Sequence, residues 1–426
     1  MRAAAAALLP LLVATAVVAG CGGDGDGGVK PVAMTSCAEL LYEGEGDPDL
    51  VVVSDLPLRG EAAKTTQLMV DAMKFVLRRR DFRAGDHRVG FQSCNQTVGD
   101  DLDEAMCRRN AQTYVETKDV VGIIGPFNSG CARIQIPIVS RVEAGPLAMI
   151  SPSNTAAELT RNIPGVESGD ALYPDGVRSY ARIVTHDEAQ GAAAAYYAVR
   201  SGARRAAILD QRGVDDPYVR GLTIPFVKAA EELGLQTTRF EWERQESYRG
   251  LAASVATARA DVVYLVGFTE LNAKRLVADL RAALPSVKLV APDSFAAEGI
   301  AREFGSVGGG LRVTVPGIPP EELPPGGQTF VRDFGKPASR VQVGGIGAPE
   351  AAQATEVLLD AIARSDGTRA SVVEELFQTK VEGGILGSFS FDRFGDIVPA
   401  PVSLYRFERG EIVVDGVIRV PLDSAR

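Results

Sequence analysis

The chain has 426 residues, of which 46% are hydrophobic and 23% charged, and its formal net charge at pH 7 is −10. This composition is typical of a globular protein, and the acidic balance argues against a nucleic-acid partner, which would require basic patches. The length is too great for one ordinary domain and fits two.

The first 21 residues read MRAAAAALLPLLVATAVVAGC: one basic residue, a short apolar stretch and small residues at its end. This pattern predicts a secretory signal peptide over 1–20. A membrane-spanning helix is the alternative, but Pro10 and the many alanines disfavour it, because a spanning helix needs about 20 strongly apolar residues. The ending resembles a bacterial lipobox, so we expect an acylated Cys21 that anchors the protein to a membrane. The Gly/Asp-rich stretch that follows predicts a flexible tether within 21–47.

Short apolar, β-branched runs then alternate with amphipathic helical patterns. The strand candidates are 49–56, 88–94, 120–125, 147–150, 180–185, 205–210, 261–267, 288–294 and 311–317. Alternation of this kind predicts an α/β fold with doubly wound parallel sheets, covered by helices on both faces. The rhythm breaks around 165–180, which divides the candidates into two sets.

Two expected strands end in small polar residues. VVGIIGPFNSG, 120–130, leads to Ser129, and LAMISPSNT, 147–155, leads to Ser153, Asn154 and Thr155. Open parallel sheets bind ligands beyond the carboxyl ends of their strands, so these turns predict a ligand site in the first lobe. The alternative, that the residues only cap the following helices, stays open.

No pattern in the sequence indicates catalysis. The stretch GPFNSGC has the spacing of a P-loop but carries Cys131 where the lysine should stand, and no G-x-S-x-G occurs. His87 lies in a charged turn, and His186, beside a predicted capping box of Asp187 and Gln190, is expected at the surface. Metal-ligand spacing is also absent, so we predict no catalytic residue, no metal and no cofactor.

Beyond the expected acylated Cys21, four cysteines remain: Cys37, Cys94, Cys107 and Cys131. An even number in an exported chain indicates two disulfides, with three ways to pair them. A zinc site is the alternative, but there is no C-x-x-C and neither histidine lies near a cysteine pair.

Several stretches together resemble a known family. VVGIIGPFNSG, AMISPSNTAAELT, DEAQGAAAAYYA, VVYLVGF, VAPDSF and the segment 358–397 occur in order along the chain. They are similar to type I periplasmic substrate-binding proteins of ABC importers, the kind that binds leucine, isoleucine and valine. The resemblance covers about 48–422, and YPDGVRSYARIV, 173–184, is similar to a lipid-anchored branch.

The resemblance implies two α/β lobes joined by three hinge strands that cross near 184, 316 and 398. Lobe 1 would comprise 48–184 and 316–397, and lobe 2 would comprise 185–315 and 398–426, with APVSLYRFERGEIVV as added strands. Such a protein, expected as a monomer on the extracytoplasmic face of the cell membrane, closes on a small solute and delivers it to an ABC permease and its ATPases. The alternative is a sensor lipoprotein for amides or organic acids that reports to a signalling receptor.

The resemblance also implies which residues bind the solute, most simply an amino acid. The α-carboxylate would meet the two turns of lobe 1, at Ser129, Ser153, Asn154 and Thr155. The ammonium would meet Asp293, where the family often has glutamate, and Tyr218 and Phe268 would line the site. Helix capping by Asp293 and ordinary core packing of the two aromatic residues are the alternatives.

The resemblance places Cys94 and Cys131 at the ends of the second and third strands, which implies the pairs Cys94–Cys131 and Cys37–Cys107; a Cys94–Cys107 bond stays open. Besides the shorter side chain of Asp293, a second feature departs from the family. In LPLRGEAAKTT an aromatic residue is missing, and Arg59 and Lys64 stand there instead. A dicarboxylate or an aromatic acid therefore remains an alternative ligand.

Overall fold

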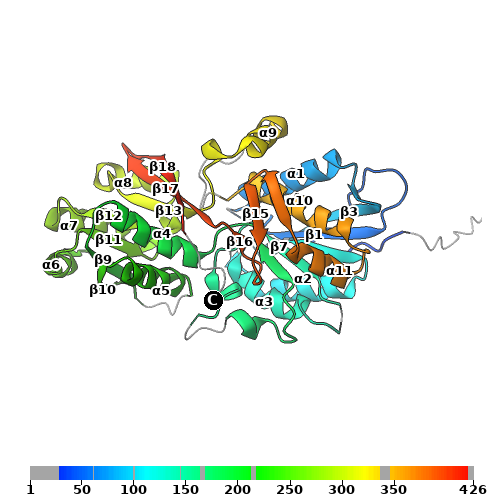
Figure 1. Ribbon diagram of the computed structural model, residues 1–426, viewed down its shortest axis with the longest axis horizontal. Helices are drawn as coiled ribbons and strands as arrows, with labels where there is room; N and C mark the ends of the chain where they lie inside the picture. Colours follow the sequence, from blue (N-terminus) through cyan, green and yellow to red (C-terminus); the bar gives the residue numbers. More distant parts are fainter. Residues whose placement is uncertain are drawn as a thin grey trace, which may run out of the picture.

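The computed structural model describes residues 28–60, 62–98, 101–143, 145–163, 168–212, 217–335 and 346–420. The described chain forms two α/β lobes that lie side by side, each built around its own sheet (Figure 1). The expected signal peptide and Cys21 lie outside the described residues. Within these ranges, no helix combines the length and the apolar character needed to cross a bilayer.

Lobe 1 contains a six-stranded sheet in the order β2-β3-β1-β6-β7-β8. Its strands are β1 (Leu50–Leu56), β2 (Arg83–Ala84), β3 (His87–Asn95), β6 (Val120–Ile124), β7 (Ala148–Ser151) and β8 (Tyr180–Arg182). Neighbouring strands are parallel except β2 and β3. Because the central strands are buried on both faces, they read as continuous apolar runs rather than as alternating ones.

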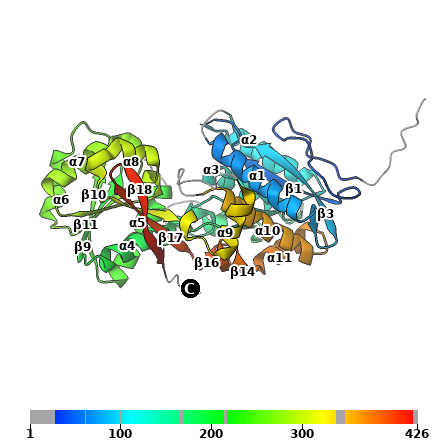
Figure 2. The same ribbon diagram turned by 90° about the horizontal axis from the view of Figure 1, so that it is seen from above.

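Helices cover both faces of this sheet. They are α1 (Ala63–Arg79), α9 (Pro325–Phe334), α10 (Ala348–Arg364) and α11 (Arg369–Phe377) on one face, and α2 (Glu104–Glu116) and α3 (Ser129–Val139) on the other. Successive residues of β1 serve opposite faces: Val52 packs in the first core, and Val51 and Val53 pack in the second. In Figure 2, α9 lies beside α1, where Phe75 contacts Phe330 with ring centroids 5.9 Å apart. Helix α9 thus belongs to lobe 1.

Lobe 2 contains a seven-stranded sheet in the order β10-β9-β11-β12-β13-β17-β18. Its strands are β9 (Arg205–Gln211), β10 (Gln236–Trp242), β11 (Val262–Val266), β12 (Lys288–Ala291), β13 (Arg312–Pro316), β17 (Pro401–Glu408) and β18 (Glu411–Arg419). The first five run parallel, and β17 and β18 are added antiparallel at one edge. One face packs against α4 (Asp187–Arg200) and α5 (Pro217–Glu232), and the other against α6 (Arg249–Thr257), α7 (Ala273–Ala283) and α8 (Glu298–Phe304).

The chain passes between the lobes three times, after β8, after β13 and before β17. Between the last two crossings, β14 (Lys380–Gly384), β15 (Gly387–Phe391) and β16 (Ile397–Val398) form a small sheet beside lobe 1 (Figure 1). The remaining short elements are β4 (Thr97–Val98), β5 (Asp101–Leu102), η1 (Ala157–Leu159), η2 (Gly169–Leu172), η3 (Thr269–Leu271), η4 (Asp293–Phe295), η5 (Gly305–Gly308) and η6 (Pro320–Glu322). The predicted fold, two parallel-sheet lobes joined by three hinge strands, is confirmed.

A buried ion pair joins the first and third crossings on the lobe 1 side. Arg182, at the end of β8, is 0% exposed and donates from Nε to Asp396 Oδ1 over 2.6 Å. Asp396 precedes β16 and also accepts from Arg161 Nε over 2.8 Å. The Arg182 N–H donates to the carbonyl of Gly395 over 2.9 Å. These bonds fasten the two outer crossings to one another before they leave lobe 1.

The segment that precedes β1 is not a free tether. The sequence predicts a flexible segment over 21–47, but its described part packs along β3: Cys37 and Leu41 form antiparallel bridges with Cys94 and Phe91. Val32 is 3% exposed. A tether can therefore include only residues before this packed stretch.

Each of the nine predicted strands overlaps a strand of the structure. Among the five parallel strands of the lobe 2 sheet, the sequence did not predict β10. It lies at the edge of its sheet with most residues exposed, and only Trp242 is buried. An edge strand of this kind carries no apolar run to reveal it.

Candidate functional site

The first predicted turn leads directly into a helix whose start has no cap. Strand β6 ends at Ile124, and α3 begins at Ser129, which is half-buried. A Cβ atom on Gly125 would lie 2.6 Å from the Asp55 carbonyl oxygen, so the close approach of this turn to β1 requires glycine. Asn128, at the cap position, makes no side-chain capping bond, and the first turn of α3 contains no acidic residue. The start of α3 therefore suits a bound anion.

Residues of the second predicted turn donate hydrogen bonds to the first turn. The Ser153 hydroxyl and the Asn154 amide both donate to the Phe127 carbonyl, over 2.9 and 2.8 Å. Both backbone N–H groups donate to the Ser151 hydroxyl, over 3.2 and 2.9 Å. Asn154 is fully buried. These two residues thus hold the turn before α3 rather than present free polar groups, and Thr155 alone of the three is half-buried.

In lobe 2 the structure brings together the three predicted residues. Tyr218 lies in the first turn of α5, Phe268 follows β11, and Asp293 follows the neighbouring strand β12. The rings of Tyr218 and Phe268 stack with centroids 5.1 Å apart. The Tyr218 hydroxyl donates to Asp293 Oδ1 over 2.7 Å, and the Gln190 amide donates to the same oxygen over 3.0 Å. The result is an aromatic wall beside a carboxylate.

A second carboxylate, Asp187, belongs to the same region. It is the first residue of α4, directly after the first crossing, and its N–H donates to the Thr155 carbonyl of lobe 1 over 2.8 Å. Its side chain is 1% exposed, and neither oxygen has a hydrogen-bond partner among the described residues. A buried carboxylate without a partner is costly. Either a proton on the carboxyl or a cation supplied by a ligand would remove this cost.

Burial and neighbouring charges act on both carboxyl groups. Burial raises the pKa of Asp187 well above its ordinary value, and the charges of Asp293 and Glu158 raise it further, against the nearby Thr155 hydroxyl. Burial also raises the pKa of Asp293, against the hydrogen bonds from Tyr218 and Gln190. Each carboxylate thus disfavours the negative charge of the other. A cation between them would lower the free-energy cost of keeping both charged.

Asp187 belongs to the stretch for which the sequence predicts a helix-capping box. The expected capping box does not form: His186 occupies the cap position without a side-chain capping bond, and Gln190 donates to Asp293 instead. His186 is 1% exposed rather than at the surface, and burial lowers its pKa to about 3. An acidic residue one position into a helix that follows a lobe crossing is the signal that could have identified Asp187.

The two cations that suggested another ligand lie at the surface. Arg59 follows β1 and Lys64 lies in the first turn of α1, and both side chains are exposed. Neither side chain shares the buried surroundings of the turn before α3.

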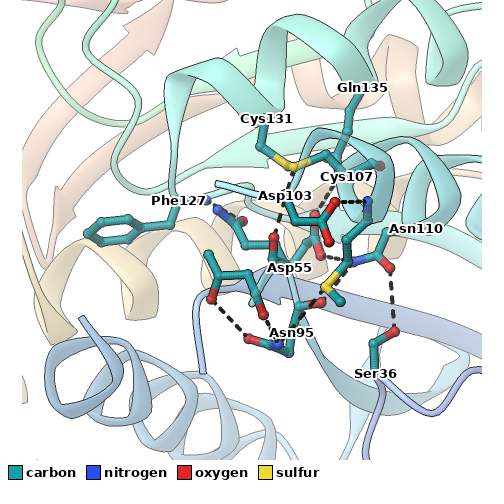
Figure 3. Close-up of a disulfide and its surroundings, with 12 residues drawn as sticks. Ser36, Asp55, Asn95, Asp103, Cys107, Asn110, Phe127, Cys131 and Gln135 are labelled. Atoms are coloured by element: carbon teal, nitrogen blue, oxygen red, sulfur yellow. Dashed lines mark hydrogen bonds between the residues drawn. A yellow bond between two sulfur atoms is a disulfide. The ribbon is translucent and has the colours of Figure 1, made fainter. Parts of the chain in front are cut away.

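The disulfide pairing implied by the resemblance is wrong. Cys37 bonds to Cys94, and Cys107 bonds to Cys131. The first pair forms because the segment before β1 runs antiparallel along β3 and places Cys37 opposite Cys94. The second joins α2 to the first turn of α3 (Figure 3). The packed N-terminal segment, which the sequence did not predict, determines this choice.

A family model described as periplasmic binding protein matches residues 95–411. The chain belongs to the periplasmic binding protein family. It is therefore a solute-binding protein rather than an enzyme, and the family functions outside the cytoplasm with ABC transporters. None of the curated proteins matches this chain.

Solved structures share the fold of this binding protein. A leucine-binding protein from Thermotoga maritima has a TM-score of 0.66 and 20% identity over 87% of this chain and 99% of that one. A substrate-binding protein from Streptococcus pneumoniae in complex with isoleucine has a TM-score of 0.64 and 15% identity over 87% and 99%. A solute-binding protein from R. palustris in complex with benzoate has a TM-score of 0.62 and 17% identity over 88% and 98%.

Proposed function

We propose that this binding protein captures an α-amino acid, with branched-chain amino acids as the first candidates, and delivers it to an ABC importer. The α-carboxylate would meet the start of α3 at Ser129, together with Thr155. The ammonium would meet Asp187 and Asp293. Because these groups lie on different lobes, a bound zwitterion would favour the closed arrangement through its contacts with both.

The unpartnered carboxylate of Asp187 carries this proposal. A ligand such as benzoate has no cation, so Asp187 and Asp293 would stay buried together with protonation alone to neutralise them. An ammonium group offers three donors and a positive charge to the same place. The stacked rings of Tyr218 and Phe268 offer an apolar surface to the side chain of the amino acid. The leucine-binding protein from Thermotoga maritima and the structure solved with isoleucine support the same ligand class.

The protein would act as a lipoprotein on the extracytoplasmic face of the cell membrane. The sequence before Cys21 supports this, because it combines a secretory signal with a lipobox-like ending. Acyl chains on Cys21 would keep the binding protein close to its permease. We expect it to work as a monomer, since the proposed site draws on the two lobes of one chain.

A thermal-shift panel of amino acids, amides and organic acids tests the ligand class, because a ligand that binds only the folded state raises its stability. Calorimetric titration of L-leucine then tests the residues. Asp293→Ala should weaken binding by about 2–5 kcal/mol, since it removes one of the two buried carboxylates proposed to meet the ammonium. Ser129→Ala removes one bond to a charged group and should cost about 1.5–3 kcal/mol.

The order of the two variants reports which end of the ligand matters. Glu231→Ala, an exposed acid later in α5, is the matched control and should bind like the wild type. For a ligand with a carboxylate but no ammonium, Ser129→Ala should be the weaker binder, and Asp293→Ala could even gain affinity. Unchanged affinity in both variants would show that the residues assigned here do not form the site.

A further inference from the structure

The Cys107–Cys131 disulfide fastens the part of α3 that the proposed function places against the ligand. Cys131 lies two residues after Ser129, in the first turn of α3, and its partner Cys107 lies in α2. Both cysteines are 0% exposed. The bond therefore fixes the first turn of α3 from within the core rather than from the surface.

A buried polar cluster fixes the next turn of the same helix. The Gln135 amide donates to Asp55 Oδ2 over 2.5 Å and to the Cys107 carbonyl over 3.2 Å. Asp55, at the end of β1, also accepts from Asn110 over 2.7 Å and from Tyr114 over 3.0 Å, both on α2. Figure 3 shows Gln135 and Asn110 reaching Asp55 beneath the disulfide. Helices α2 and α3 are thus both attached to the carboxyl end of β1.

On the other side of Ser129 the chain is fixed at Phe127. Its N–H donates to Gln96 Oε1 over 3.1 Å, and its carbonyl accepts from Ser153 and Asn154. Asn128 and Ser129 follow Phe127 and lead into the helix. Their side chains make no hydrogen bond in the described part of the chain. Their position depends on what holds the two ends, Phe127 and Cys131.

We propose that the Cys107–Cys131 disulfide is a positioning element for the carboxylate end of the ligand. It would hold the first N–H groups of α3 and the Ser129 hydroxyl in place before the ligand arrives, so that binding need not order them. This inference rests on the proposed function, because it takes the start of α3 as the place where the ligand binds. Loss of the bond leaves α3 attached through Gln135, one turn deeper, and frees the turn that contacts the ligand.

The test compares two double variants of the full-length protein. Cys107→Ser/Cys131→Ser removes the proposed positioning bond, and Cys37→Ser/Cys94→Ser removes the other disulfide of the same lobe as the control. In that control pair Cys94 is buried and Cys37 is half-buried. Hydrogen–deuterium exchange follows the amides of 128–134, with α6 of lobe 2 as an internal reference for global unfolding. Titration with L-leucine measures affinity.

We expect exchange over 128–134 to accelerate by about tenfold or more in Cys107→Ser/Cys131→Ser and to stay near the wild-type rate in the control. The Kd for L-leucine should rise by roughly 5- to 50-fold in the first variant only. Equal exchange over 128–134 in both variants would overturn the proposal. If serine prevents folding, Cys107→Ala/Cys131→Ala gives the same comparison without a buried hydroxyl.

The two proposals fail in different ways. Wild-type protein that does not bind any amino acid contradicts the proposed function, whereas the exchange measurement on the ligand-free variants decides the positioning role alone. Tight L-leucine binding by Cys107→Ser/Cys131→Ser, with unchanged exchange over 128–134, would leave the function in place and overturn the role of the disulfide.

Discussion

Replacing Asp187 by asparagine should separate stability from ligand binding. In the ligand-free protein this carboxylate is 1% exposed and has no hydrogen-bond partner among the described residues. Asparagine has nearly the same shape and no charge. We therefore expect Asp187→Asn to raise the free energy of unfolding of the ligand-free protein by about 1–3 kcal/mol at pH 7.5, because a buried charge costs more than the buried neutral amide that replaces it.

The difference in free energy of unfolding between Asp187→Asn and the wild type should grow with pH. Burial, with the charges of Asp293 and Glu158, raises the pKa of Asp187 in the folded protein above its value in the unfolded chain. Below about pH 3.9 the carboxyl is protonated in both states and adds no pH dependence. At higher pH the unfolded chain releases the proton first, so the wild type loses stability relative to Asp187→Asn until the pH passes the folded-state pKa.

The same substitution should weaken L-leucine binding by about 2–5 kcal/mol, or roughly 30- to 5,000-fold, because the ammonium loses a buried charged partner. Urea unfolding at pH 4, 6 and 7.5 measures the stability, and calorimetric titration measures the affinity. Asp47→Asn, at an exposed position, is the control for the loss of one negative charge. A variant that is less stable than the wild type at pH 7.5 and binds L-leucine equally would refute this reasoning.

Three further predictions use other parts of the molecule. Burial raises the pKa of Glu350 to about 7, and its Oε2 accepts from the Gly347 N–H over 2.8 Å. Glu350→Gln keeps an acceptor for this bond and removes the titrating group. Urea unfolding should therefore show a free energy of unfolding above that of the wild type, by an amount that grows between about pH 4.5 and 7 and is absent below about pH 4.5. Cys21→Ser should move the protein from the membrane to the soluble fraction, because acylation supplies the membrane affinity; a variant that stays with membranes contradicts the lipoprotein assignment. Small-angle scattering should show a smaller radius of gyration with saturating L-leucine than without, and equal radii would mean that the ligand does not close the lobes.

The strands of both lobes could be predicted from the sequence because their physical signal is local. A strand buried on both faces must be apolar throughout, so β6 and β11 are visible as short runs. Strand β10 and the segment around Cys37 gave no such signal. Both lie on edges, where hydrogen bonds with a neighbouring strand and a few buried side chains hold the chain, so no continuous apolar run is needed.

Which of the proposed site residues lie close together was predictable where they follow the ends of neighbouring strands. Phe268 and Asp293 come together because β11 and β12 are adjacent and parallel. Ser153 and Asn154 are at the expected turn, but their hydrogen bonds go to Phe127, and the partner of a polar side chain cannot be read from its position in the sequence. Asp187 was missed because its lack of a partner is visible only in three dimensions.

The buried pair of Arg182 and Asp396 has a mechanical consequence. Since it fastens two of the three crossings together on the lobe 1 side, the torsions that swing the lobes are confined to a few peptide units between this pair and lobe 2. If the lobes close on a solute as proposed, the motion would be close to a rotation about one axis. Such a solute would meet two bodies with little relative freedom to lose, so that more of the contact energy would remain as affinity.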